Sequence, residues 1–71
     1  MNKYAIGNNL HVLLKERKMS QKQLADAIGV DINSISKWMN GYMQPSNYSV
    51  YKAAKVLGVP MERLMEGIED E

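Results

Sequence analysis

Two helix boundaries meet near the centre of the chain, in the stretch Gly29-Val30-Asp31. Glycine after an apolar helical stripe permits the left-handed backbone that ends a helix, and aspartate before the next stripe is a good N-cap. Two short helices joined this closely must cross at a steep angle. Their contact needs a small residue on the first helix and a branched apolar residue on the second, and Ala25 and Ile35 stand at those places. The sequence therefore predicts a tight pair of short helices at its centre.

Further start and stop signals divide the rest of the chain into helices. Ser20 followed by Gln23 has the spacing of a capping box, Ser46 is a good N-cap, and Gly58 is a good stop. No segment alternates between apolar and polar residues with a period of two, so we expect no strand. The predicted fold class is all-α, with five helices over about residues 5–18, 20–28, 31–39, 46–57 and from 60 onward.

The apolar residues of these helices recur at the three- and four-residue spacing of a buried helix face. Trp38 follows Ile35 by three residues and is therefore expected in the core, and Tyr48 is expected to pack near the fourth helix. The predicted core consists of Ile6, Leu10, Leu13, Leu14, Leu24, Ala25, Ile28, Ile35, Trp38, Met39, Val50, Tyr51, Ala54, Leu57, Met61, Leu64, Met65 and Ile68.

Size and composition exclude several classes of protein. The chain has 71 residues, which predicts one domain over 1–68 with an acidic tail over 69–71. It has no cysteine, which excludes a disulfide and a thiolate metal site. No apolar run approaches the roughly 20 residues of a membrane span, and we expect a cytoplasmic protein. The sequence has no nucleophile–base pair and no glycine-rich phosphate loop, so neither an enzyme nor a small-molecule substrate is expected. His11 has no ligand-type neighbour at a suitable spacing, so we expect no metal or cofactor and place His11 on the surface.

The charges of the chain are unevenly distributed. Residues 1–55 hold eight basic and three acidic side chains, whereas residues 56–71 hold one basic and five acidic side chains. A basic body with an acidic tail is typical of a protein with a polyanionic partner. A solvated surface with a solubilising tail would give the same counts, and charge alone does not separate these two interpretations.

The third predicted helix has a polar side that the core does not need. With 100° per residue, Ile35, Trp38 and Met39 occupy one arc of this helix. The opposite arc carries Asn33, Ser36, Lys37 and Asn40. These polar residues are free to contact something outside the protein.

Four segments of the sequence resemble the phage repressor and Cro-like (XRE-type) helix-turn-helix family. They are "MSQKQLADAIGVDINSISKWMNG", "QPS", "AAKVLGVP" and "MERLM", and the resemblance covers about residues 6–66. It implies a five-helix fold, a transcriptional regulator, a third helix that enters the major groove of double-stranded DNA, and binding as a dimer.

Within this resemblance, the polar side of the third helix becomes the surface that contacts bases. Asn33 has the geometry to pair with adenine, and Lys37 to donate to guanine or to a phosphate. Ser36 is a permissive contact. Ile32 lies at the border of the arc, where it either covers a thymine methyl group or completes the packing at the helix start.

The resemblance also implies which residues contact the DNA backbone. They are Gln21, Lys22, Asn40, Tyr42, Gln44 and Ser46. Lys15 and Lys18 add positive charge if their faces point toward DNA. The sequence departs from the family in the loop over residues 41–46, which is often rich in lysine and arginine in the family and has neither here.

A second departure concerns the first and third helices. Many family members pair an arginine with a glutamate at the positions where this chain has Leu14 and Met39. An apolar pair can replace a buried ion pair without loss of stability, because no charge has to be desolvated. We therefore expect Leu14 and Met39 to lie against each other.

The sequence as a whole predicts a sequence-specific regulator, most simply a repressor. It would bind a two-fold operator as a homodimer, with half-sites roughly 34 Å apart. Two other interpretations remain open at this point. One is an antitoxin-like module that uses the same fold to bind a partner protein, and the other is a non-specific nucleoid or RNA binder.

Overall fold

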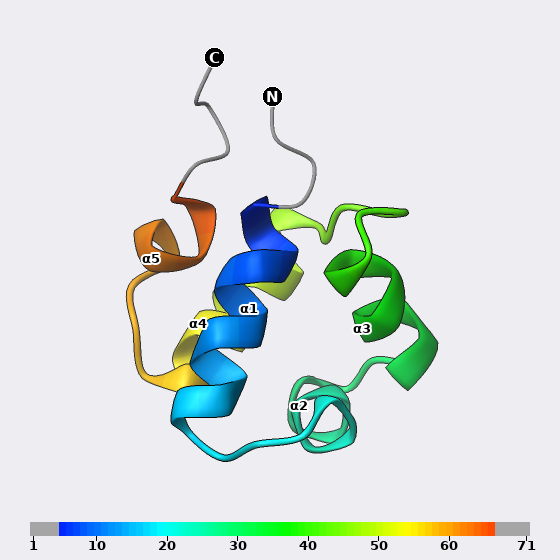
Figure 1. Cartoon of the computed structure of the whole chain (residues 1–71), viewed down its shortest axis with the longest axis horizontal. Helices are drawn as coiled ribbons and strands as arrows, with labels where there is room; N and C mark the ends of the chain where they lie inside the picture. The colour runs from blue at the N-terminus through cyan, green and yellow to red at the C-terminus, as the bar shows by residue number, and fades with distance from the viewer. Residues whose placement is uncertain (1–4, 67–71) are drawn as a thin grey trace.

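The computed structural model describes residues 5–66 and contains five helices in that range. They are α1 (Ala5–Glu16), α2 (Gln21–Ile28), α3 (Ile32–Met39), α4 (Asn47–Leu57) and α5 (Met61–Met65), shown in Figure 1. The described range contains no strand. The predicted all-α, five-helix fold is thus confirmed.

The helix boundaries follow the capping signals. The Ser20 hydroxyl accepts from the N–H of Gln23 at 3.0 Å, and the Gln23 side chain accepts from the N–H of Ser20 at 2.8 Å, so the capping box is complete. Gly29 ends α2 with a left-handed backbone (φ +78°). The Asp31 carboxylate then accepts from the N–H of Asn33 at 2.7 Å and starts α3. One residue, Val30, is therefore enough to connect the two helices.

The first helix ends two residues earlier than expected, at Glu16. The cause is Lys18, which adopts a left-handed backbone (φ +54°) without being glycine. The N–H of Met19 then reaches back to the carbonyl of Leu14 at 2.9 Å and closes the end of α1. Lys18 plays the part that Gly29 and Gly58 play after α2 and α4.

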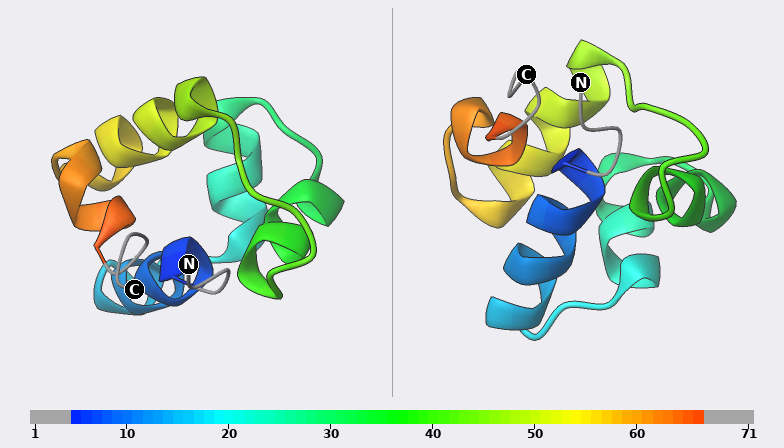
Figure 2. Two further views of the ribbon diagram at one scale, coloured as in Figure 1. Left: turned by 90° about the horizontal axis from the view of Figure 1, so that it is seen from above. Right: turned by 45° about the horizontal axis from the view of Figure 1, so that its top comes forward.

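The five helices form a closed ring around one core, as the left view of Figure 2 shows. Their principal contacts join α1 to α3, α3 to α2, α2 to α4, α4 to α5, and α5 back to α1. α2 and α3 lie next to each other on one side of the ring, and α4 and α5 lie across from α3.

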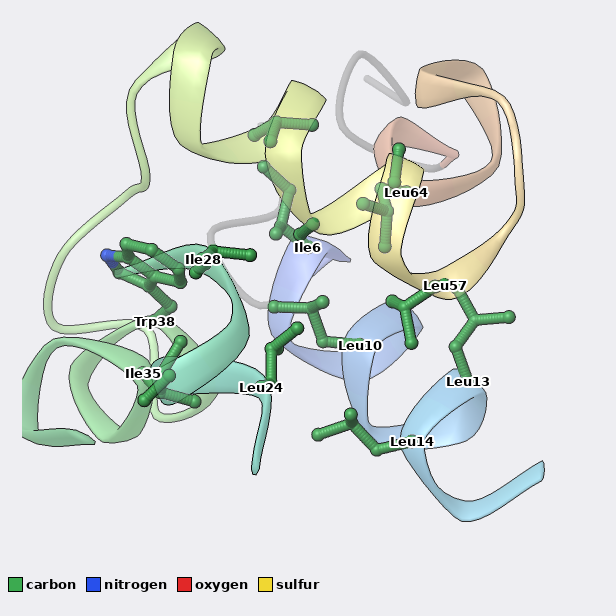
Figure 3. Close-up of a cluster of buried hydrophobic side chains, with 14 residues drawn as sticks. Ile6, Leu10, Leu13, Leu14, Leu24, Ile28, Ile35, Trp38, Leu57 and Leu64 are labelled. Carbon is green, nitrogen blue, oxygen red and sulfur yellow. The ribbon is translucent and has the colours of Figure 1, made fainter. Parts of the chain in front are cut away.

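Every helix contributes buried side chains to the core. In Figure 3, the labelled side chains of Leu10, Leu24, Leu57 and Leu64 converge from α1, α2, α4 and α5. Trp38 is buried as predicted. The core comprises Ile6, Leu10, Leu13, Leu14, Leu24, Ala25, Ile28, Ile35, Trp38, Val50, Ala53, Ala54, Leu57 and Leu64, with Met19, Val30, Met39, Val59, Met61 and Met65 packed against it. Ile68 and the expected end of the domain lie outside the described residues.

Two tyrosines of α4 lie outside the core, and for Tyr51 this contradicts the prediction. Tyr51 is 45% exposed, and Ala53 is buried in its place. The reason is the phase of α4, in which Val50, Ala53, Ala54 and Leu57 share one face and Tyr51 is turned away from it. Tyr48 is also exposed, and the ammonium of Lys52 lies 4.6 Å from the centroid of its ring.

The junction between α1 and α3 depends on a glycine. A Cβ atom built on Gly7 would lie 2.7 Å from the carbonyl oxygen of Trp38 and 2.8 Å from that of Met39. These are backbone atoms at the end of α3, and real Cβ atoms do not approach so closely. Glycine at position 7 therefore permits the end of α3 to lie directly against α1.

Side chains that bond to the carbonyl ends of other helices secure further junctions of the ring. The Asn9 amide donates to the carbonyl of Leu64 at 2.7 Å, joining α1 to α5. The Lys52 ammonium donates to the carbonyl of Ile28 at 2.8 Å, joining α4 to α2. The last carbonyls of a helix have no partner within the helix, and a basic or amide side chain satisfies them well.

Candidate nucleic-acid interface

α3 buries one face and presents the other to solvent. Ile35 is fully buried and Trp38 nearly so, and Met39 is half-buried. On the opposite side Asn33 and Lys37 are exposed. The predicted division of this helix into an apolar and a polar side is confirmed, although whether the polar side contacts DNA stays a prediction.

The start of α3 leaves two side chains uncommitted. The Asp31 carboxylate accepts from the backbone N–H of Asn33, so the side-chain amide of Asn33 keeps its donors and acceptor. Within residues 5–66 neither the Asn33 amide nor the Lys37 ammonium has a hydrogen-bond or ion-pair partner. Ile32 is 43% exposed beside them, an unusual place for a branched apolar side chain. Together these residues form a surface with an amide, an ammonium and an apolar group.

Ser36 and Asn40, by contrast, interact with each other. The Asn40 amide donates to the Ser36 carbonyl at 2.9 Å and lies 3.5 Å from the Ser36 hydroxyl. Asn40 is also the C-cap of α3, and Ser36 is half-buried. The two residues therefore finish the helix, and the exposed side chains of this face that have no partner within residues 5–66 are those of Asn33 and Lys37.

The loop after α3 is folded back onto the helix end. Gly41 has φ +75°, and this turn lets the N–H groups of Tyr42 and Met43 reach the carbonyl of Lys37 at 2.9 and 3.4 Å. Tyr42 is 83% exposed, so its hydroxyl stands clear of the protein beside the end of α3. Gln44 is exposed as well.

Ser46 has a structural role that limits its availability. Its hydroxyl accepts from the N–H of Ser49 at 3.1 Å and lies 3.1 Å from the Ser49 hydroxyl, so it caps α4. The sequence predicted both this cap and a phosphate contact by the same residue. The cap is confirmed, and the phosphate contact stays a prediction.

The start of α2 provides the other expected backbone contacts. Gln21 is half-buried, and Lys22 is exposed and pairs with Asp26 at 3.4 Å. A surface pair of this kind contributes at most about 1 kcal/mol and exchanges readily for another partner. The capping box uses the N–H groups of Ser20 and Gln23. The N–H groups of Gln21 and Lys22 have no hydrogen-bond partner within residues 5–66.

A pocket of about 290 Å³ lies where α1, the start of α2 and the end of α3 meet. It is lined by His11, Leu14, Lys15, Met19, Gln21 and Met39. Leu14 and Met39 both line it, and whether this apolar pair replaces an ion pair stays a prediction. From the sequence, His11 was expected on the surface without a role in binding. The four-residue spacing of His11 and Lys15 on α1 is the signal that could have grouped them.

Between residues 5 and 66, no three His, Cys, Asp or Glu side chains are grouped so that they could hold a metal ion. None of the helices described is long and apolar enough to cross a membrane.

A capped helix with a buried face, a tight turn before it and an exposed polar face define a helix-turn-helix DNA-binding domain. A family model described as helix-turn-helix matches residues 10–64. The chain therefore belongs to the phage repressor and Cro-like (XRE) helix-turn-helix family, whose members are DNA-binding regulators rather than enzymes. A comparison with curated proteins finds no match.

Proposed function

We propose that the chain is a transcriptional repressor that binds a specific operator in double-stranded DNA. The observation that carries this proposal is the state of Asn33 and Lys37, which are exposed on α3 and have no partner among the described residues. An amide and an ammonium on the same helix face match the donor and acceptor pattern of base edges in the major groove. Asn33 pairs with adenine, and Lys37 donates to guanine or to a nearby phosphate.

Two neighbouring residues complete the surface that contacts bases. Ile32 stands at the exposed start of α3 and covers a thymine methyl group, a contact that favours thymine without a hydrogen bond. Ser36 adds a hydroxyl at the edge of this surface. Because α3 is only eight residues long, one copy reads only a short half-site.

The phosphate contacts flank this surface on both sides. On one side are Gln21 and Lys22 at the start of α2, and on the other Asn40, Tyr42, Gln44 and Ser46 at and after the end of α3. Such contacts fix the position of α3 on the duplex and carry no sequence information themselves.

The chain acts as a homodimer in this proposal, with the two copies of α3 in successive major grooves. Half-sites roughly 34 Å apart then fit a two-fold operator. The half-buried side chains of Met61 and Met65 support a pairing surface on α5. Binding of the dimer across a promoter in the cytoplasm excludes RNA polymerase.

Selection from a pool of random duplexes tests the proposal. A repressor enriches a palindrome, a non-specific binder enriches no sequence, and a protein-interaction module binds no duplex. On the enriched palindrome, Asn33→Ala should relax the preference at one base pair by about 1–3 kcal/mol. Lys55→Ala is the control, because Lys55 lies at the far end of α4, across the ring from α3, and should leave sequence preference unchanged.

A further inference from the structure

The pocket between α1, α2 and α3 combines an apolar floor with a rim of nitrogen donors. The floor consists of Leu14, Met19 and Met39, which are buried or half-buried. The rim consists of His11 and Lys15, both exposed, and the half-buried amide of Gln21. A site of this composition suits a ligand with anionic oxygen atoms and adjacent C–H groups.

Lys15 is one of few described cations without a partner. Lys22 pairs with Asp26, Arg17 with Glu16, and Arg63 with Glu66. Lys52 bonds to a carbonyl, and Lys55 lies over the ring of Tyr51. Among the lysines and arginines in residues 5–66, those left without a partner are Lys15, Lys18 and Lys37. Lys37 belongs to the surface that contacts bases, and Lys15 lines the pocket.

The pocket is continuous with the proposed DNA interface. Gln21 belongs to both, since it lines the pocket and stands at the start of α2, where a phosphate contact is expected. Met39 lines the pocket and directly precedes Asn40, an expected phosphate contact on the other flank. A DNA strand bound at the start of α2 would therefore lie beside the pocket.

We infer that this pocket holds one sugar–phosphate unit of the bound duplex. Lys15 and His11 donate to the phosphate oxygens, and Leu14, Met19 and Met39 contact the deoxyribose. An imidazole offers at least one N–H donor in either protonation state. This inference rests on the proposed function and assigns to it two contacts, Lys15 and His11, that lie on α1 rather than on α2, α3 or the loop.

A phosphate contact by Lys15 compensates for the absence of cations in the loop after α3. Residues 41–46 contain neither lysine nor arginine, so the loop supplies hydrogen bonds but no charge. Binding to DNA gains most of its salt dependence and much of its affinity from cations that displace counterions. In this chain the cation is Lys15 on α1, which lies on the side of α3 away from the loop over residues 41–46.

The salt dependence of binding is the first test. Each phosphate neutralised contributes about 0.9 to the slope of log K against log salt concentration for duplex DNA. This slope is negative, and Lys15→Ala should reduce its magnitude by about one and leave the sequence preference unchanged. Lys15→Arg should keep the magnitude of the slope. The matched control is Lys18→Ala. It removes the same charge three residues further along the chain, from a side chain that does not line the pocket.

A phosphate scan gives the second measurement. Single phosphates of the duplex are replaced one at a time by neutral methylphosphonates, and the affinity of each duplex is measured. At one position, the neutral phosphate should weaken binding by the wild-type protein but should not weaken binding by Lys15→Ala any further. In His11→Ala, the effect of the neutral phosphate at that position should also be reduced. Thermal melts of each variant without DNA show that the variants are folded.

The outcomes separate this inference from the proposed function. If the wild-type protein binds duplex DNA but Lys15→Ala keeps its slope, or loses no more than Lys18→Ala, the pocket does not hold a phosphate and the inference fails alone. If duplexes bind without sequence preference, the slopes still decide the inference while the operator proposal fails. If no duplex binds, both are wrong.

Discussion

Gly7→Ala is the substitution whose effect on stability the structure predicts most sharply. The new Cβ would lie 2.7 Å from the carbonyl oxygen of Trp38, 2.8 Å from that of Met39 and 2.9 Å from the Cα of Met39. All three are backbone atoms, so no side-chain rotation relieves the overlap. The end of α3 has to retreat by roughly half an ångström or more to restore ordinary contact distances.

The magnitude follows from two opposing effects. Overpacking of a well-packed junction costs about 1–3 kcal/mol. Replacing glycine by alanine in a helix returns at most about 1 kcal/mol through helix propensity. Because all three close contacts are with backbone atoms, the overpacking cost falls in the upper part of that range, at about 2–3 kcal/mol. The free energy of unfolding should therefore fall by about 1–2 kcal/mol. In a domain of this size each kcal/mol lowers the melting temperature by roughly 4–8 °C.

Urea denaturation followed by far-ultraviolet circular dichroism measures this change. The control is Asn8→Ala, an exposed neighbour on the same helix that changes propensity without adding contact, and it should be neutral or slightly stabilising. Emission from Trp38 should also shift to longer wavelength in Gly7→Ala, because its helix end moves outward. A variant as stable as the wild-type protein, with unchanged emission, would show that α1 and α3 are not in close contact at Gly7.

Three further substitutions test the packing of the ring. Leu14→Arg should lower the free energy of unfolding by about 2 kcal/mol or more, because it removes a buried leucine and adds a charge without a partner. In the double variant with Met39→Glu, the loss should be smaller than the sum of the two single losses by at least about 1 kcal/mol. If the two single losses simply add, these side chains do not meet. Lys52→Met keeps the length of the side chain but removes the bond to the Ile28 carbonyl, and should cost about 1–3 kcal/mol in denaturant melts. Unchanged stability in Lys52→Met would mean that this bond does not hold α4 to α2.

The helix boundaries could be predicted because their causes are local. Ser20 with Gln23, Asp31 and Ser46 each bond to backbone groups two or three residues away, so the pattern of letters contains the whole interaction. Lys18 is the exception. A lysine with a left-handed backbone carries no signal in the sequence, and for that reason α1 was expected to continue two residues too far.

The junctions between helices could not be predicted, because their causes are distant in sequence. Asn9 bonds to a carbonyl 55 residues away, and Lys52 to one 24 residues away. Gly7 reads as an ordinary helical residue until α3 is placed against it. The assignment of Tyr51 to the core was wrong for a different reason, because the signal there is local. At about 100° per residue, Ala53 falls within the arc of Val50, Ala54 and Leu57, and Tyr51 falls outside it.

The same division applies to the candidate site. The exposed face of α3 was predictable from a helical wheel, since it depends on one helix alone. The pocket was not, because it joins side chains from α1, α2 and α3. Lys15 was considered only as a general charge and His11 as a surface residue, and their common environment became visible in three dimensions.

The junctions of the ring also differ in how they are held, and this bears on α3. Hydrogen bonds from Asn9 and Lys52 secure the α1–α5 and α2–α4 junctions, and the turn at Gly29 secures α2 to α3. Among the described residues, no hydrogen bond joins α1 to α3. That junction consists of backbone contact at Gly7 and apolar contact at the pocket. A DNA strand bound in the pocket would connect α1 to the α2–α3 pair from outside, at the junction that the protein leaves without a polar link. Binding should therefore raise stability most at this junction, seen as slower amide exchange at the end of α3 in the complex.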